Sequence, residues 1–198
     1  MTGIDNSADM IAAARERLPN VPFELADVSA WDAPGPFDLI LANASLQWVG
    51  DHETLLPGLV YKLAPGGRLA VQMPDNLDEP AHKMMLVAAQ DGPWRDKLTG
   101  VERTVRFRAE AYYSLLKTHC AQVDVWRTTY HHPLEGGLDA VIEWFKGSAL
   151  RPFLARLDKD EQPAFLERYR GALESAYAVL PDGTVLLPFP RFFIVATR

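Results

Sequence analysis

The chain has 198 residues, of which 48% are hydrophobic and 23% charged, as in a globular domain with an apolar core. Its net charge of −6 and isoelectric point of about 5.3 exclude the basic surface that nucleic-acid binding requires. No apolar run approaches the roughly 20 residues of a membrane span, and no signal peptide is evident. Cys120 is the only cysteine, so no internal disulfide can form. We therefore expect one monomeric cytoplasmic domain without a nucleic-acid or membrane partner.

The first 74 residues alternate between short apolar runs and helical segments. The run at residues 37–42 is nearly continuous, which is typical of a strand buried on both faces of a parallel sheet. Alternation with short connections favours parallel pairing and right-handed crossovers, and residues 64–67 read as a sharp turn. We predict strands at 1–5, 21–25, 37–42 and 68–73, and helices at 8–18 and 51–63.

The second half of the chain predicts a helical block between two strands. Residues 91–107 read as a polar connection that contains Gly and Pro. We predict helices at 79–90, 109–119, 138–145 and 161–177, and strands at 122–130 and 191–197. The fold class is therefore α/β, one domain over residues 1–198, with a helical cap inserted at 135–188 before the last strand.

Two carboxylates end neighbouring predicted strands. Asp5 ends the first strand and Asp27 follows the next, at the edge where open α/β sheets bind ligands. Asp5 can accept both hydroxyls of a ribose, or it can cap the helix after it. Asp27 can accept the exocyclic amine of an adenine while the Val28 amide faces the ring, or it can be a plain turn residue. Together they predict an adenosine pocket, to which we also assign Asn6 and Met10.

The end of the third predicted strand carries further polar candidates. Asn43 lies where a reacting centre would sit and is assigned to the cofactor site, although it can instead satisfy backbone groups of a turn. Gln47 and Trp48 follow on a loop and offer an amide and a flat apolar wall, although Trp48 can equally belong to the core. No Cys/His cluster has metal-ligand spacing, and no nucleophile–base pair is suggested. We therefore expect no metal and no catalytic side chain.

Three arginines are candidates for binding an anionic substrate. Arg127 is near the end of the penultimate strand, Arg151 lies between two cap helices, and Arg191 begins the last strand. Guanidinium groups bind carboxylates bidentately, whereas most arginines only solvate a surface. We expect these three to bind the substrate, with Arg151 first among them.

Several segments resemble the class I S-adenosylmethionine-dependent methyltransferases, and among them the trans-aconitate 2-methyltransferase family. The later segments are the more specific ones. Those that carry the resemblance include Gly3-Ile4-Asp5, Ala26-Asp27-Val28, Ala42-Asn43-Ala44-Ser45-Leu46-Gln47-Trp48-Val49, Leu63-Ala64-Pro65-Gly66-Gly67, Gly147-Ser148-Ala149-Leu150-Arg151-Pro152 and Phe189-Pro190-Arg191-Phe192-Phe193.

The resemblance implies a Rossmann-like sheet, S-adenosyl-L-methionine as cofactor, and methyl transfer to a carboxylate of trans-aconitate, a small polycarboxylate, to give a monomethyl ester. It also implies a helical region, a first strand and a Gly-rich loop before the segment matching residues 2–5. We expect the reading frame to begin upstream of Met1. The alternative is a true truncation, a remnant that does not bind the cofactor.

Other functions are open at this point. The loop at Gln47 and Trp48 also resembles the malonyl-carrier-protein methyltransferases, whose acceptor is a thioester-linked carboxylate. An acidic carrier would dock on a basic face, for which Arg103, Arg106 and Arg108 are candidates. A nicotinamide-dependent dehydrogenase also places an acid after its second strand, but no catalytic His or Tyr-Lys arrangement supports it.

Overall fold

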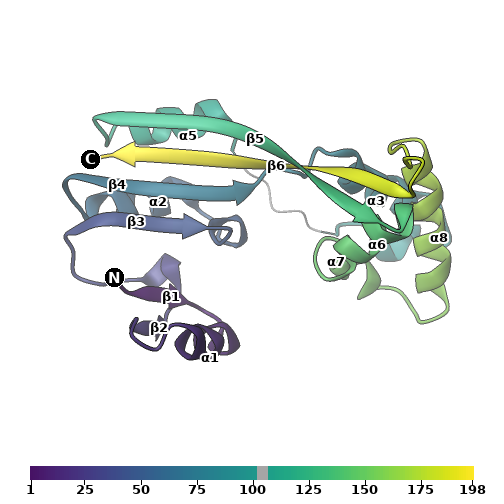
Figure 1. Cartoon of the computed structure of the whole chain (residues 1–198), viewed down its shortest axis with the longest axis horizontal. Coiled ribbons are helices and arrows are strands. Elements are labelled where there is room, and N and C mark those ends of the chain that lie inside the picture. Colours follow the sequence, from purple (N-terminus) through teal and green to yellow (C-terminus); the bar gives the residue numbers. More distant parts are fainter. Residues whose placement is uncertain (102–106) are drawn as a thin grey trace.

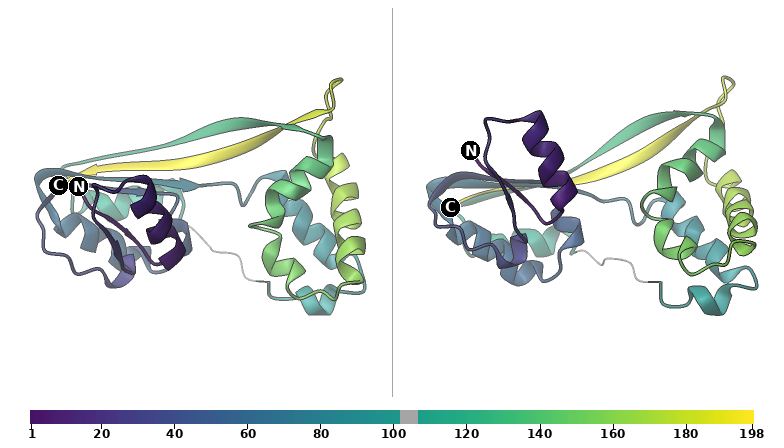
Figure 2. Two further views of the ribbon diagram at one scale, coloured as in Figure 1. Left: turned by 60° about the horizontal axis from the view of Figure 1, so that its bottom comes forward. Right: turned by 90° about the horizontal axis from the view of Figure 1, so that it is seen from below.

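The computed structural model describes residues 1–101 and 107–198 and divides into a sheet lobe and a helical lobe (Figure 1). A long two-stranded ribbon, β5 and β6, connects the two lobes (Figures 1 and 2). Four strands form one sheet in the order β3-β4-β6-β5, and β1 and β2 form a separate pair. The strands are β1 (Gly3–Asp5), β2 (Phe23–Leu25), β3 (Phe37–Asn43), β4 (Leu63–Pro74), β5 (Gln122–Glu135) and β6 (Thr184–Thr197).

The helices divide between the two lobes. Those of the sheet lobe are α1 (Ala8–Arg17), the 3-10 turns η1 (Val28–Ala30) and η2 (Leu46–Trp48), α2 (His52–Tyr61) and α5 (Ala109–Lys117). Those of the helical lobe are α3 (Pro80–Gln90), α4 (Arg95–Leu98), α6 (Gly137–Lys146), α7 (Arg151–Leu154) and α8 (Glu161–Glu174). Within the described residues, no helix combines the length and the hydropathy needed to cross a bilayer.

Helix α1 forms where its sequence predicts it. Ser7 is its N-cap, and the Ser7 hydroxyl accepts a hydrogen bond from the Met10 amide at 3.4 Å. Asp9 in the first turn and Arg15 and Arg17 in the last turn complement the helix dipole. The parallel pairing of β1 with β2 around this helix confirms the predicted crossover unit.

The four-stranded sheet is mixed. β3 and β4 are parallel, as predicted, whereas β6 runs antiparallel to both β4 and β5. Helices α2 and α5 cover one face, where Leu69, Val71 and Met73 of β4 pack against side chains such as Leu56 and Tyr112. The apolar residues that alternate along β4 therefore build the core of the sheet lobe.

The prediction that residues 37–42 are buried on both faces was wrong. Leu39 and Leu41 are 57% and 67% exposed, on the sheet face that α2 and α5 do not cover. β3 pairs with β4 alone among the described strands and is therefore an edge of the sheet. The apolar run correctly predicted a strand, but whether the side chains of that strand are buried depends on which layers cover the sheet.

Two turn predictions need correction. Residues 64–67 do not form a turn ahead of the strand, because they belong to β4, which begins at Leu63, the partner of Phe37. The register shifts after that pair, and Gly66 absorbs the irregularity at a φ of 78°. Within the predicted polar connection at 91–107, α4 forms after the buried Trp94. Trp94 Nε1 donates to the Ala88 carbonyl at 2.9 Å and so fixes this segment on α3.

Strands β5 and β6 are longer than predicted, since β6 begins at Thr184 rather than at Arg191. Pro188 and Pro190 discourage a strand prediction because proline cannot donate to a ladder. Residues 184–190 pair only with β5. None of the described strands lies along the other edge of this segment, so no N–H group is needed there. The ribbon therefore continues past the end of β4 into the helical lobe.

The helical lobe has its own core, formed mainly by α3, α6 and α8. Phe165, Tyr169 and Leu173 line the inner side of α8 and are fully buried. The Tyr169 hydroxyl donates to the Ala81 carbonyl at 3.1 Å, which ties α8 to the start of α3. The helical lobe therefore combines α3 and α4, which precede α5 in the chain, with α6, α7 and α8, which follow it.

Candidate functional site

The carboxyl ends of β1 and β2 place the two predicted acids on one edge. Asp5 is paired with Leu25 in the parallel ladder, and the Ala26 amide donates to the Asp5 carbonyl at 3.0 Å. Asp27 comes two residues after Leu25. Since parallel strands end on the same side of their sheet, both carboxylates belong to the same rim.

Each of the two carboxylates is held by the backbone that follows it. Asp5 Oδ1 accepts from the Ser7 amide at 2.8 Å, and Asp27 Oδ1 accepts from the Ser29 amide and hydroxyl at 2.8 and 2.7 Å. These bonds from Ser29 lower the pKa of Asp27 below its ordinary value. Neither Oδ2 atom receives a hydrogen bond from a described group, so both carboxylates retain acceptor capacity.

The remaining candidates of this edge lie beside the two acids in sequence. Asn6 and Met10 are exposed, at the entrance to α1 and in its first turn, and Met10 is 59% exposed. Val28 is half-buried in η1 and packs against the core of the sheet lobe. That contact connects the β1–α1–β2 unit to the four-stranded sheet.

The carboxyl ends of β3 and β4 point toward the helical lobe (Figure 1) and carry a second polar group. Asn43 is the register partner of Gln72, and both lie on the face that α2 and α5 leave uncovered. Arg191 of β6 reaches the same place, where its Nη1 donates to Gln72 Oε1 at 3.0 Å. Strand pairing therefore assembles an asparagine, a glutamine and an arginine at one end of the sheet.

Arg191 is half-buried, and within the described residues no carboxylate forms an ion pair with it. Its guanidinium lies over two aromatic rings, 5.1 Å from the centroid of Phe189 and 5.8 Å from that of Tyr130. Aromatic faces attract a guanidinium and hold its plane while its N–H donors stay available. The arrangement leaves a positive group ready to bind an anion.

The loop after β3 buries Gln47 and exposes Trp48. Gln47 is 7% exposed, and its Nε2 donates to the Ala44 carbonyl at 2.6 Å. Ala44 itself has a φ of 53°, a strained conformation for a residue with a side chain. Trp48 is 74% exposed, which rules out the alternative that it belongs to the core.

The other two candidate arginines differ in how far they are already paired. Arg127 binds Asp75 Oδ2 at 2.9 Å and Glu79 Oε1 at 3.0 Å, so its charge is balanced within the chain. Arg151 is exposed and begins α7, on the side of the helical lobe that faces the sheet lobe (Figures 1 and 2). Strand pairing brings Arg191 to the carboxyl end of the sheet, whereas Arg151 belongs to the helical lobe.

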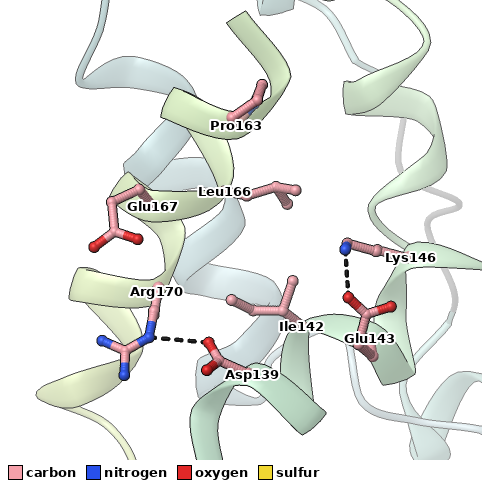
Figure 3. A pocket seen from close by; sticks show the side chains of 8 residues that line it. All are labelled: Asp139, Ile142, Glu143, Lys146, Pro163, Leu166, Glu167 and Arg170. Carbon is pink, nitrogen blue, oxygen red and sulfur yellow. Dashed lines mark hydrogen bonds and ion pairs between the residues drawn. The ribbon is translucent and has the colours of Figure 1, made fainter. Parts of the chain in front are cut away.

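A shallow pocket of about 210 Å³ lies between α6 and α8 and holds none of the predicted site residues (Figure 3). Both of its cations already pair with lining carboxylates, Arg170 with Asp139 at 3.0 Å and Lys146 with Glu143. We therefore place the functional site at the strand ends.

Comparison with known proteins decides the family. A family model described as a methyltransferase domain matches residues 1–67. A trans-aconitate 2-methyltransferase of Yersinia pseudotuberculosis serotype O:1b (strain IP 31758) is 48% identical over 198 residues, 99% of this chain and 76% of that protein. One from Variovorax paradoxus (strain S110) is 47% identical and covers 100% of this chain and 77% of its own length. The chain belongs to the trans-aconitate 2-methyltransferase family.

Solved structures agree on the fold of this family member. The YcgJ protein of Bacillus subtilis has a TM-score of 0.58 at 11% identity, over 100% of this chain and 81% of its own. Phosphoethanolamine N-methyltransferase 2 of Haemonchus contortus, solved with S-adenosyl-L-methionine, has a TM-score of 0.51 at 16% identity, over 98% of this chain and 42% of its own. The chain is an S-adenosylmethionine-dependent methyltransferase with a class I fold.

Sequence reasoning about this methyltransferase missed Gln72. It is not among the predicted site residues, although it is a polar residue in the otherwise apolar run from Leu69 to Met73. That interruption was the available signal.

Two residues of the predicted carrier-docking face, Arg103 and Arg106, lie outside the described residues, and Arg108 is exposed at the start of α5.

Proposed function

We propose that this protein transfers the methyl group of S-adenosylmethionine to a carboxylate of trans-aconitate, giving the monomethyl ester. The observation that carries the proposal is the unpaired, half-buried guanidinium of Arg191 at the carboxyl ends of β3 and β4. The names of relatives that are 47–48% identical support the same acceptor. An anionic acceptor suits this residue because the chain's own carboxylates leave it free.

The edge formed by β1 and β2 fits the adenosine half of the cofactor. The free carboxylate oxygen of Asp5 would accept ribose hydroxyls, and that of Asp27 would accept the adenine amine. We assign Asn6, Met10 and Val28 to the surroundings of this nucleoside and Asn43 to the side nearest the acceptor. The cofactor supplies a methyl group activated by a sulfonium charge.

The chain needs no general base for this reaction. A carboxylic acid with a pKa near 4 is already ionised at neutral pH, so no proton has to be removed before the acceptor oxygen takes the methyl group. The task of the side chains is to orient the acid and to exclude water. This agrees with the absence of a nucleophile–base pair among the predicted site residues.

Holding a small polyanion in place requires cations. We assign Arg191 to the acid on the sheet side, and Arg151 on α7 as a second cation from the helical lobe. Gln47 and Trp48 border the same end of β3 and shape the pocket. Arg127 contributes least to substrate binding, because Asp75 and Glu79 already balance its charge.

Transfer of a labelled methyl group to trans-aconitate tests the proposal. We expect a small, base-labile ester as the labelled product, and we expect Arg191→Met to raise KM for the acid about 30-fold or more. Arg168→Met, a surface change at an arginine that pairs with Asp91, is the matched control and should keep the wild-type KM. Label transferred only to a thioester-bound acid on an added carrier protein would favour the alternative acceptor. Absence of any labelled ester would contradict carboxyl methylation.

A further inference from the structure

Gln72 is a buried carboxamide with an unused donor. Its side chain is 7% exposed, and its Nε2 has no hydrogen-bond partner among the described residues. A buried amide N–H without a partner costs free energy, so such groups are rare in folded proteins and call for an explanation.

Arg191 determines which way this amide points. A guanidinium has only donors, and Nη1 of Arg191 lies 3.0 Å from Gln72 Oε1. The reverse orientation would bring two donors together, so the oxygen, and not the Nε2 atom, contacts Arg191. The unpartnered amide is therefore a fixed feature of the contact and cannot be relieved by rotating the side chain.

The result is a pair of adjacent donors for an anion. The Gln72 amide nitrogen is bonded to the same carbon as the oxygen that Arg191 contacts, so its N–H groups and the remaining N–H groups of Arg191 belong to one polar cluster, with the guanidinium over Phe189 and Tyr130. Nε2 itself is buried, so an anion that accepts from both groups displaces the side chains that cover it. Neither side chain offers a free acceptor at this point, because the amide oxygen is already bonded. A donor-only arrangement at a half-buried arginine matches a carboxylate.

We propose that Gln72 and Arg191 together bind the substrate carboxylate that is not methylated, and that this makes the enzyme select acids with at least two carboxylates. The inference rests on the proposed function for the identity of the acceptor. Gln72 acts as a binding residue next to Arg191.

Charge changes during the reaction explain why these donors bind the unreactive carboxylate. The reacting oxygen loses negative charge as its new bond to carbon forms. Donors aimed at it would stabilise the ground state more than the transition state and slow the reaction. A carboxylate that keeps its charge is stabilised equally in both states, so the interaction lowers KM and leaves kcat unchanged.

Two substitutions of Gln72 separate binding from folding. Gln72→Met removes the amide and keeps a similar volume. Gln72→Glu keeps an acceptor for Arg191, but its charge neutralises the guanidinium that the substrate needs. We expect KM for trans-aconitate to rise about tenfold in the first and about 30-fold or more in the second, with kcat within twofold of wild type. The thermal midpoint of Gln72→Glu should equal or exceed that of wild type, because the contact with Arg191 remains.

Gln90→Glu, at an exposed position that ends α3, makes the same chemical change away from the site and should keep the wild-type KM. Unchanged KM in both Gln72 variants, or a larger change in kcat than in KM, would overturn the proposal. Equal kcat/KM for trans-aconitate and for crotonate, which has one carboxylate, would also overturn it.

A direct binding measurement keeps this test separate from the proposed function. If the wild-type chain fails to methylate trans-aconitate, the proposed acceptor is wrong, and calorimetry with tricarballylate, a saturated tricarboxylate, then tests the donor pair without turnover. Binding by wild type and Gln90→Glu that is lost in both Gln72 variants would support the pair. Equal binding by all four proteins, or none by wild type, would refute it.

Discussion

His52 and Tyr112 meet in the core of the sheet lobe, where the Nδ1 atom of the imidazole lies 2.7 Å from the phenol oxygen. The other ring nitrogen, Nε2, lies 2.9 Å from the Leu46 carbonyl, which can only accept. Nε2 therefore carries the proton, and Nδ1 accepts from the Tyr112 hydroxyl. The contact fixes the start of η2, the turn that places Gln47 and Trp48 at the end of β3.

Replacing Tyr112 by Phe should destabilise the sheet lobe. The change leaves the buried Nδ1 of His52 without a donor, so we expect the free energy of unfolding to fall by about 1–2 kcal/mol. Urea denaturation followed by circular dichroism measures it, and Tyr113→Phe, at an exposed neighbour on α5, is the matched control. Equal midpoints for the two variants would show that the contact with His52 contributes nothing to stability.

Asp5→Asn should weaken cofactor binding without disturbing α1. Asparagine keeps an oxygen for the Ser7 amide but loses the negative charge, and charge-assisted hydrogen bonds are about twice as strong as neutral ones. We expect KM for S-adenosylmethionine to rise about tenfold, with little change in KM for the acid. Asp9→Asn, in the first turn of α1, tests whether a lost charge nearby has the same effect. An unaltered cofactor KM in Asp5→Asn would remove this residue from the nucleoside site.

The helical lobe should lose stability at alkaline pH. Burial raises the pKa of Tyr169 far above its ordinary value of 10.0, and burial also raises the pKa of Tyr177. Above pH 10 the unfolded chain releases these protons while the folded chain retains them, so the free energy of unfolding falls as pH rises. Its slope approaches about 1.4 kcal/mol per pH unit for one tyrosine. Well below pH 10 both states keep these protons, so the groups do not make stability depend on pH there.

Unfolding in urea at pH 8, 10 and 11 measures this slope, and Tyr169→Phe removes the titrating group. The variant should unfold about 1 kcal/mol more easily at pH 8, because the bond to the Ala81 carbonyl is lost, and its stability should depend less on pH. A slope between pH 10 and 11 that is the same in the variant as in wild type would assign the alkaline loss to other groups.

The uncovered side of β3 should promote self-association of this chain. Leu41 is 67% exposed on an edge strand, where apolar side chains favour contact with other molecules. Leu41→Lys should reduce oligomers in light scattering and change the free energy of unfolding by less than about 0.5 kcal/mol. Leu18→Lys, at an exposed leucine that ends α1, provides the comparison. Equal scattering from Leu41→Lys and wild type would show that this strand is not where molecules meet.

Local signals in the sequence predicted much of the fold. The cap of α1 at Ser7, the parallel pair around that helix and the strand at residues 37–42 depend on neighbouring residues along the chain, so spacing and propensity were enough. Resemblance identified the family for the same reason, since its motifs are short and contiguous. Asp5 and Asp27 could be placed on one rim because parallel strands end together.

Only the tertiary structure decided which side of β3 is buried and which arginine is free. Leu39 and Leu41 read as core, yet exposure depends on the helices that cover one face of the sheet. Arg127 and Arg191 look equivalent in sequence, but Asp75 and Glu79 pair with the first, while Gln72, 119 positions away, orients against the second. Desolvation and ion pairing are set by groups that are distant in sequence, and a residue's type alone does not reveal them.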